Sequence, residues 1–407
     1  MPFPCMFEVK QVRKVPLIDD VEGELRRQLR LINLKRMLKG ARSVAITGSS
    51  RGLPRGVEII RTLTDELRAL GARPFIIPAM GSHGGGRARG QEELLASLGI
   101  TRESVGAPIR ATMETVEIDK TKWGLPILID KYAYEADATI VLNSIKPHTN
   151  FEAPIQSGLM KMICVGLGKA DGAKIFHDYA QRYGYYPVIL EMARRVLNRF
   201  PILMGLAVVE NLYHRPSIIR AIPPKNIETE EKKLLKASQR LMGRLPFKEI
   251  DLLIVDEFGK DISGSGMDPN VIGRVASKEG PPRPRIKYIY VRDLTEETHG
   301  NVIGIGLADI VSRRVWEKMD LGVTRTNVFT AKAFDQTRIP MPADSDEEAI
   351  VAALSALGLG DPKKARIVWI KNTRELATFK ISESLLKEAR ANPDLEVSKE
   401  GARPLLP

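Results

Sequence analysis

The chain has 407 residues, of which 43% are hydrophobic and 28% are charged. These proportions are typical of a globular protein, and they exclude long disorder and collagen-like repeats. The length predicts two or three domains, and each half is long enough to bury a core of its own. The longest apolar run, 201–209, is too short for a membrane helix, and residues 1–14 lack the pattern of a signal peptide. We therefore expect a cytoplasmic protein with no membrane contact.

The formal net charge of +12 raises the question of a nucleic-acid partner. The basic residues are spread along the chain, and the densest stretch, 26–39, has leucines at helical spacing. This pattern predicts an amphipathic helix with a solvated basic face, and since no nucleic-acid-binding motif is present, we expect no nucleic-acid partner. A basic pocket for an anionic substrate or a phosphorylated cofactor stays open. With only Cys5 and Cys164, a disulfide framework and a thiolate zinc site are not expected.

The first half of the chain alternates strand-like and helix-like segments. Short apolar runs predict strands at 43–47, 74–78 and 138–142, and helical periodicity predicts helices at 57–70 and 91–98. Strand, polar loop and helix in succession are the signature of βαβ units, so we predict an α/β fold. The ligand site of such a sheet lies at the carboxyl ends of its strands. Arg51, His83 and His148 all lie there.

The second half begins after a highly charged helical segment at 226–244, which has the pattern of a connector between domains. Strands are predicted at 251–255, 287–291 and 366–370, and helices at 306–320, 346–357 and 382–391. We therefore predict an N-terminal catalytic α/β domain over 1–245 and a C-terminal α/β domain over 246–380. A C-terminal helix and tail follow over 381–407, and whether the tail returns to the N-terminal domain is left open.

Histidine is informative because the chain has only five, at His83, His148, His177, His214 and His299. The first three lie in one half of the chain, in small-residue or turn contexts that we expect to be loops at strand ends. A lone histidine is more often structural than catalytic, but three in such loops favour a shared site. Imidazole transfers protons near neutral pH and binds nickel, zinc or iron.

Three further features have both a functional and a structural interpretation. The glycine stretch 166–172 matches neither the dinucleotide-binding spacing nor the P-loop spacing. The glycine-rich stretch 81–86 either lets a ligand approach the backbone closely or is a mobile surface loop. Arg51 either clamps a carboxylate or phosphate or is a surface residue. Lys161, in an apolar setting, is either a nucleophile with a lowered pKa or a structural or phosphate-binding lysine.

Taken in order, these residues resemble the nickel-pincer lactate racemase family. Five short motifs carry the resemblance: Ser50-Arg51, Gly81-Ser82-His83, Pro147-His148, Ser157-Gly158-Leu159-Met160-Lys161, and His177 sixteen residues beyond that lysine. Each motif is weak alone, but five in the right order are specific. The resemblance covers about residues 43–180 well and the C-terminal half only in general layout.

The resemblance implies a two-domain α/β enzyme with its active site in the interdomain cleft. It implies a nickel-pincer nucleotide (pyridinium-3,5-bisthiocarboxylic acid mononucleotide nickel), bound by the Ser157-Gly158 motif and held covalently on Lys161, with His177 as the nickel ligand. By the same resemblance, Ser50 and Arg51 bind the substrate carboxylate, and His83 and His148 are the two catalytic bases.

The implied activity is that of an isomerase, a racemase or epimerase of a 2-hydroxy acid that works by proton-coupled hydride transfer. Its implied partners are the small-molecule substrate and the proteins that make the cofactor. A homo-oligomer is left open, as is the identity of the 2-hydroxy acid.

The sequence also departs from the family pattern. Leu159 replaces a glycine, the stretch 148–157 is longer than in the family, and the loop 264–274 lacks the expected Gln and Lys. Lys260, Arg274 and Lys278 are candidates to replace them. Trp369 either flanks the cofactor or belongs to the core. Two alternatives stay open: an epimerase of a sugar acid or larger 2-hydroxy acid, and a non-catalytic α/β protein that binds a nucleotide or metal.

Overall fold

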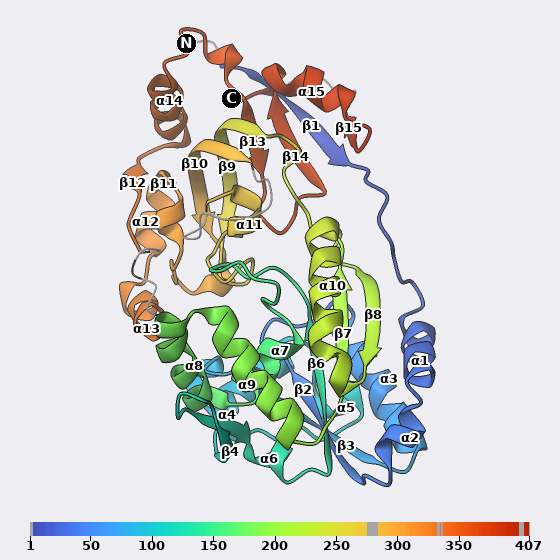
Figure 1. Ribbon diagram of the computed structural model, residues 1–407. Helices are drawn as coiled ribbons and strands as arrows, with labels where there is room; N and C mark the ends of the chain where they lie inside the picture. The colour runs from blue at the N-terminus through green and yellow to red at the C-terminus, as the bar shows by residue number, and fades with distance from the viewer. Residues whose placement is uncertain (1–2, 275–283, 332–333, 335–336, 399–402, 407) are drawn as a thin grey trace. The chain divides into compact units, whose positions relative to one another are not determined.

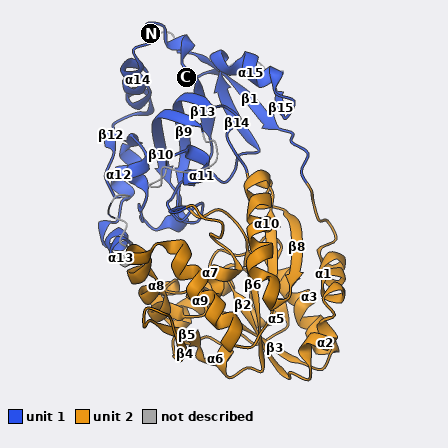
Figure 2. Cartoon of the chain, viewed as in Figure 1, with its two compact units in different colours: residues 1–15, 149–151, 243–407 blue, residues 16–148, 152–242 orange. Residues whose placement is uncertain are grey.

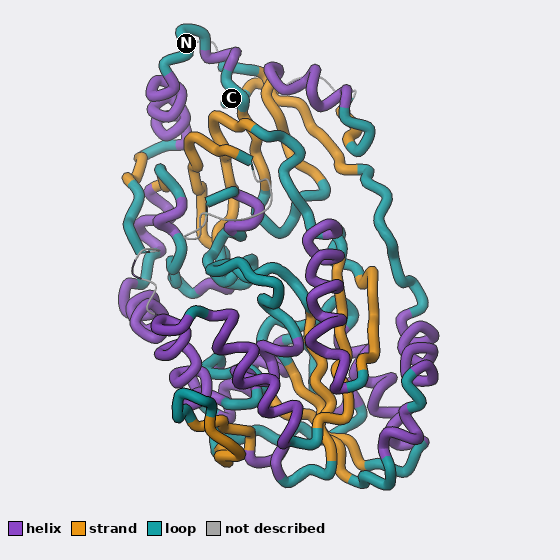
Figure 3. The backbone as a smooth tube through the Cα atoms, in the orientation of Figure 1, coloured by secondary structure: helices purple, strands orange, loops and turns teal. Residues whose placement is uncertain are grey.

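The computed structural model describes residues 3–274, 284–331, 334, 337–398 and 403–406 (Figure 1). The chain forms two compact units (Figure 2): unit 1 comprises residues 1–15, 149–151 and 243–407, and unit 2 comprises residues 16–148 and 152–242. Both units combine strands with helices, as Figure 3 shows, so the predicted α/β class is confirmed. Within the described ranges, no helix has the length and apolar character needed to span a membrane.

Unit 2 is built on a five-stranded sheet in the order β3-β2-β6-β7-β8. The strands are β2 (Ser43–Gly48), β3 (Arg73–Pro78), β6 (Ala138–Ser144), β7 (Ile202–Glu210) and β8 (Pro216–Ile222). All neighbours are parallel except β7 and β8. Parallel strands are buried on both faces, which is why they read as continuous apolar runs in the sequence. The run at 201–209 is such a strand, β7.

The helices and the hairpin of unit 2 surround this sheet. The helices are α1 (Val21–Leu31), α2 (Leu34–Leu38), α3 (Gly56–Ala69), α4 (Ala88–Ser97), α5 (Arg102–Val105), α6 (Lys131–Tyr134), α7 (Leu159–Lys161), α8 (Lys169–Tyr183), α9 (Tyr185–Arg199) and α10 (Ile227–Leu241). A separate two-stranded hairpin is formed by β4 (Thr115–Lys120) and β5 (Pro126–Asp130). The basic stretch 26–39 forms two helices, because Asn33 takes a left-handed conformation (φ 53°) between α1 and α2.

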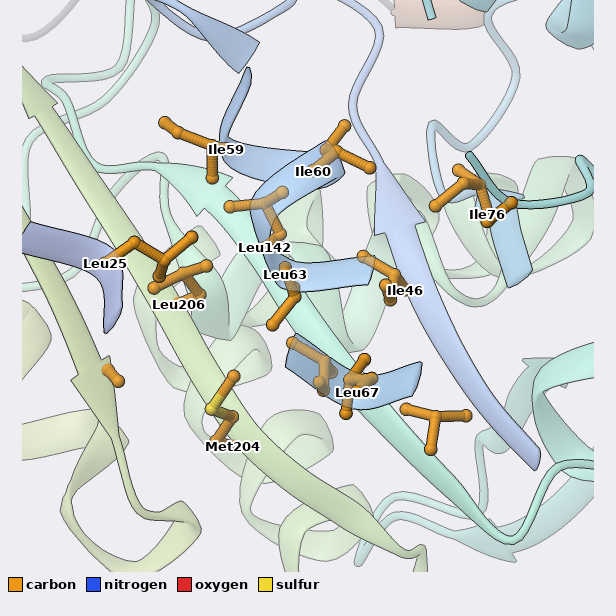
Figure 4. Packing of buried hydrophobic residues seen from close by; sticks show 14 of the residues in the cluster. Leu25, Ile46, Ile59, Ile60, Leu63, Leu67, Ile76, Leu142, Met204 and Leu206 are labelled. Carbon is orange, nitrogen blue, oxygen red and sulfur yellow. The ribbon is translucent and has the colours of Figure 1, made fainter. Parts of the chain in front are cut away.

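The core of unit 2 is formed by one face of α3 and the strands beneath it. Residues three and four apart lie on the same face of a helix, so the apolar residues of α3 form a single buried stripe. Figure 4 shows this packing, with labelled side chains at Leu25, Ile46, Ile59, Ile60, Leu63, Leu67, Ile76, Leu142, Met204 and Leu206. The turn that joins β2 to α3, which carries Arg51, is therefore held at both ends by buried elements.

Unit 1 contains a sheet in the order β12-β11-β10-β9-β13-β14-β1-β15, with β16 also paired to β1. Its strands are β1 (Cys5–Gln11), β9 (Glu249–Phe258), β10 (Arg285–Leu294), β11 (Ile310–Ser312), β12 (Met341–Ala343), β13 (Ile367–Ile370), β14 (Thr378–Ser382), β15 (Leu395–Val397) and β16 (Arg403–Pro404). Its helices are α11 (Pro269–Ile272), α12 (Arg313–Lys318), α13 (Leu321–Ala331), α14 (Asp346–Leu357) and α15 (Leu386–Ala391). Residues 1–15, which the sequence division assigns to the first domain, pair here with the tail of the chain.

Two helices predicted in this unit are wrong over part of their length. In place of the single helix expected at 306–320, residues 305–307 form a 3-10 turn, 310–312 form β11, a short strand parallel to β10, and only α12 is α-helical. Three residues are too few for a periodic pattern to show. The helix expected at 382–391 has its α-helical part, α15, only from Leu386, because Ser382 is the last residue of β14.

Candidate active site

Ser50 and Arg51 lie in the turn that follows β2, at the carboxyl end of a central parallel strand. Ser50 is partly buried and Arg51 is exposed. The charge of Arg51 nevertheless lowers the pKa of both Lys161 and His148. The structure therefore brings this guanidinium to the same place as two other candidate residues, where a cation can bind a carboxylate.

His83 lies on the loop that follows β3, the neighbouring strand. Its Nδ1 is 2.8 Å from the carbonyl oxygen of Met80. Since a carbonyl can only accept, Nδ1–H is the donor, and the lone pair of the neutral ring lies on Nε2. Gly81 has φ 57° and Gly84 has φ 66°, and a Cβ at Gly84 would lie 2.6 Å from the backbone of α4. The glycines thus allow a tight loop that presents an exposed imidazole.

His148 and Lys161 are brought together by a small backbone bridge. Lys146 and Ser157 exchange backbone hydrogen bonds of 2.9 and 3.2 Å, which closes the intervening segment into a loop. The backbone N–H of His148 donates to Oε1 of the buried Gln156 at 2.7 Å, which fixes the first part of that loop. Nζ of Lys161 then lies 2.5 Å from Nε2 of His148, although the two residues are thirteen positions apart.

The electrostatics of this pair favour a neutral imidazole. Burial lowers the pKa of His148 well below its usual 6.5, and the charge of Lys161 adds to the effect. Arg51 and His177 lower it further. Burial, followed by the charge of Arg51, lowers the pKa of Lys161 to about 8. At neutral pH the lysine is therefore the hydrogen-bond donor and His148 the acceptor, and the amine lies close to the pH range in which it becomes a nucleophile.

The helical turn that carries Lys161 begins at a buried carboxyl group. Oε2 of Glu231, on α10, accepts from the backbone N–H of Met160 at 2.8 Å, and the side chain is fully buried. A Cβ on Gly158 would lie 2.3 Å from Oε1 of Glu231, which explains why glycine follows Ser157. Burial raises the pKa of Glu231 to about 8. A π-turn over Met162–Gly166 follows Lys161 directly, a feature often found at functional sites.

His177 lies within a helix rather than in a loop, which corrects the expectation from sequence. α8 begins at Lys169, inside the glycine stretch, and Gly172 is one of its buried residues. The imidazole of His177 packs edge-on against Phe176 and Tyr185, with ring centroids 5.3 and 6.4 Å away. Its effect on the pKa of His148 places it in the same group as Arg51 and Lys161.

A model of the lactate racemase N-terminal domain matches residues 7–181, the segment that contains Arg51, His83, His148, Lys161 and His177. This match concerns the lactate racemase N-terminal domain alone, and it covers less than half of the chain. The structure is similar to that of the lactate racemase apoprotein from Thermoanaerobacterium thermosaccharolyticum, with a TM-score of 0.54 and 16% sequence identity. That similarity covers 91% of this chain and 99% of the other, and it shows a shared fold.

A structural-genomics structure of a protein from Thermotoga maritima is also similar, with a TM-score of 0.49 and 13% identity. The match covers 67% of this chain and 70% of that one. Among curated protein sequences, none matches the chain with significance.

The candidates in the second half of the chain lie in unit 1. Trp369 has the cations of Arg292 and Lys380 within 5.0 and 4.8 Å of its ring centroid, and its indole N–H donates to Asp256 at 2.8 Å. The guanidinium of Arg274 donates to the backbone oxygens of the adjacent segments and pairs with an aspartate. The backbone N–H of Lys260 donates to a threonine hydroxyl at 3.1 Å. Lys278 lies outside the described residues.

Two buried charged groups of unit 2 were not predicted from the sequence. Glu231 belongs to the segment that was interpreted as a connector, whereas α10 packs against β7 and α7. Lys169 belongs to the glycine stretch and forms a fully buried ion pair with Asp130. Neither residue is marked by a motif. The one available signal is that Asp130 ends an apolar run, where an unpaired carboxylate would be costly to bury.

Proposed function

We propose that this protein is a racemase or epimerase of a 2-hydroxy acid and that its activity depends on a nickel-pincer nucleotide. The observation that carries the proposal is the 2.5 Å contact between Lys161 and His148, with Arg51 and His177 close enough to lower the pKa of His148. A reactive amine, a neutral base, a carboxylate-binding cation and a metal-binding imidazole then share one site. The match of residues 7–181 to the lactate racemase N-terminal domain supports this assignment.

The residues present fit such a cofactor. In the described part of the chain, no three His, Cys, Asp or Glu side chains are grouped as metal ligands. A single histidine is sufficient when the cofactor itself supplies the other donors, and His177 is the imidazole available for that role. Lys161 would hold the cofactor through its amine, whose pKa of about 8 makes the neutral, nucleophilic form accessible. When bound, the cofactor supplies a hydride acceptor for the carbon that bears the hydroxyl group.

The chain's own residues then bind the substrate and move its proton. Arg51 binds the carboxylate, and its planar guanidinium suits two parallel hydrogen bonds. His83 accepts the hydroxyl proton at Nε2, since its Nδ1–H is bonded to Met80 and orients the ring. His148 offers a second base, and two bases allow the proton to be taken and returned on either face. General acid–base catalysis of this kind is worth about 10²–10⁴-fold.

Attachment of Lys161 would also change the state of His148. The ammonium group now lies against Nε2 of His148 and suppresses its protonation. Acylation of the amine removes that positive charge and leaves Nε2 available to the substrate. The apo chain therefore holds one catalytic base in an inactive contact until the lysine is modified.

The experiment is coexpression with the cofactor-making proteins, followed by nickel analysis and peptide mass spectrometry. A nickel-containing adduct on Lys161 is expected in the wild type and absent in Lys161→Ala. Lys174→Ala, at an exposed position of α8, is the matched control and should load normally. No adduct on the wild type, with another lactate racemase loading in parallel, would refute the cofactor assignment.

The loaded protein is then assayed with lactate and with larger 2-hydroxy acids, which identifies the substrate. His83→Ala and His148→Ala are each expected to abolish turnover while the adduct remains. His299→Asn, at an exposed position in unit 1, should keep full activity. Full activity in either of the first two variants would remove that residue from the catalytic pair.

A further inference from the structure

A fully buried lysine lies at the start of α8, outside the group of catalytic candidates. Nζ of Lys169 is 3.2 Å from Oδ2 of Asp130, and both side chains have 0% exposure. The same Nζ donates to the carbonyl oxygen of Pro78 at 2.7 Å and to Oε1 of Gln91 at 2.8 Å. Two of the three ammonium hydrogens are therefore used in hydrogen bonds, and the carboxylate of Asp130 balances the charge.

These contacts connect Lys169 to the loop that carries His83. Pro78 is the last residue of β3, and that loop follows it directly. The amide of Gln91, on α4, is oriented by Lys169 through Oε1, and its Nε2 donates to the carbonyl oxygens of Gly81 and His83 at 2.8 and 3.2 Å. A continuous chain of hydrogen bonds therefore runs from the first residue of α8 to the backbone of His83. α8 also carries His177.

The arrangement is costly, which argues for a specific use. A buried ion pair gains little over well-packed apolar residues, because both charges lose their hydration. Burial lowers the pKa of Lys169 and raises that of Asp130, which means that desolvation disfavours the charged form of each group. Lys169 also takes a left-handed conformation, with φ 57°, which a side chain with a Cβ adopts only at a cost. Apolar residues would fill the same volume without these penalties.

We propose that Lys169 is a positioning residue that fixes the His83 loop against α8, and with it the placement of His83 relative to His177. The inference rests on the proposed function for the roles of the two histidines. The connection itself, from Lys169 through Gln91 to the loop, depends only on the contacts given above. Lys169 touches neither substrate nor cofactor in this proposal and acts through the backbone of the loop.

Gln91→Glu isolates the connection. A glutamate at this position still accepts from Lys169, but it can no longer donate to the carbonyl oxygens of Gly81 and His83. Lys169→Met removes the ammonium group from the other end of the same chain. Leu63→Ala, on the buried face of α3, is the control for a general loss of stability in the same unit.

The measurement is amide hydrogen exchange of the apo protein over residues 79–87. The backbone N–H groups of His83 and Gly86 donate within this loop, so they report its opening. We expect Gln91→Glu and Lys169→Met each to speed exchange there by about fivefold or more, the factor that one lost hydrogen bond of ordinary net strength gives. Leu63→Ala should leave this segment unchanged relative to the rest of unit 2. Unchanged exchange of the loop in Gln91→Glu overturns the proposal, even if Lys169→Met fails to fold.

Steady-state kinetics of the loaded protein give the second readout. A loop that positions a base affects the chemical step, so Gln91→Glu should lower kcat about tenfold or more with little change in KM. A loosened loop with unchanged kcat overturns the positioning role. If the wild type itself shows no racemase activity, the proposed function fails, whereas the exchange result still decides whether Lys169 holds the loop.

Discussion

Glu231 should make the stability of unit 2 depend on pH in a way that one substitution removes. Burial raises the pKa of this carboxyl group to about 8, against 4.5 for an exposed glutamate. The folded state therefore binds the proton more tightly than the unfolded state does. The resulting stabilisation is complete below about pH 4.5 and is lost as the pH rises to about 8. Glu231→Gln, which keeps an acceptor for the N–H of Met160, mimics the protonated group and has no such dependence.

The magnitude follows from the two pKa values. Between them, each unit of pH changes the free energy of unfolding by about 1.4 kcal/mol. From about pH 6 to about pH 8, the wild type should lose about 2–3 kcal/mol relative to Glu231→Gln. At about pH 6 the wild type should already be less stable than Glu231→Gln by about 2 kcal/mol, because the carboxyl group is protonated in the folded state but ionised in the unfolded state.

The assay is equilibrium unfolding in urea at a series of pH values between about 6 and 9. Trp316→Phe and Trp369→Phe leave Trp123 as the only tryptophan, so fluorescence reports unit 2. The wild type and Glu231→Gln are compared in this background at each pH, which cancels the titration of other groups. Equal pH dependence in the two proteins would show that Glu231 is ionised in the folded state, and the account of its burial would be wrong.

Two other substitutions test local parts of the same unit. Lys161→Met removes the charge beside His148, so the pKa of His148 should rise. It should stay below 6.5, because burial is the largest cause of the lowered pKa. NMR titration of the imidazole measures this pKa, and an unchanged value would contradict the contact between the two side chains. Thr47→Val removes a buried hydroxyl that bridges the N–H and C=O of Leu142 and should cost about 1–3 kcal/mol in urea unfolding. Thr64→Val, at a buried hydroxyl with no hydrogen-bond partner among the described residues, should cost nothing, and equal losses at the two positions would refute the argument.

The strands that could be predicted are those buried on both faces. Apolar runs in the sequence predict β2, β3 and β6 of the parallel sheet in unit 2, and the predicted strand boundaries agree with the structure to within two residues at each end. In unit 1, β1 was missed because only Met6, Val9 and Gln11 of its seven residues are buried, so the strand has no continuous apolar run. A strand signal is weak in a segment of only seven residues that includes an acidic and a basic side chain. β14 was missed for a different reason, since its sequence runs directly into a helical segment.

The candidate site could be predicted as a set of residues but not as an arrangement. Strand ends indicate that Arg51, His83 and His148 lie at one edge of a sheet. The contact between His148 and Lys161 depends on a two-residue bridge that no local pattern reveals. Glu231 is about seventy positions from the turn that it caps, and a buried lysine such as Lys169 reads in the sequence like any surface lysine.

The place of β1 in the sheet of unit 1 has a consequence for biosynthesis. Unit 2 is inserted between β1 and the rest of unit 1, so it can fold as soon as residue 242 has left the ribosome. β1 is translated before unit 2, whereas its partners β14, β15 and β16 are translated only after unit 2 and most of unit 1. During that interval it is a strand with unpaired edges, which invites aggregation. A circular permutation that places residues 1–15 after residue 407 would shorten the time during which β1 lacks its partner strands. It should therefore raise the soluble yield at high expression rates.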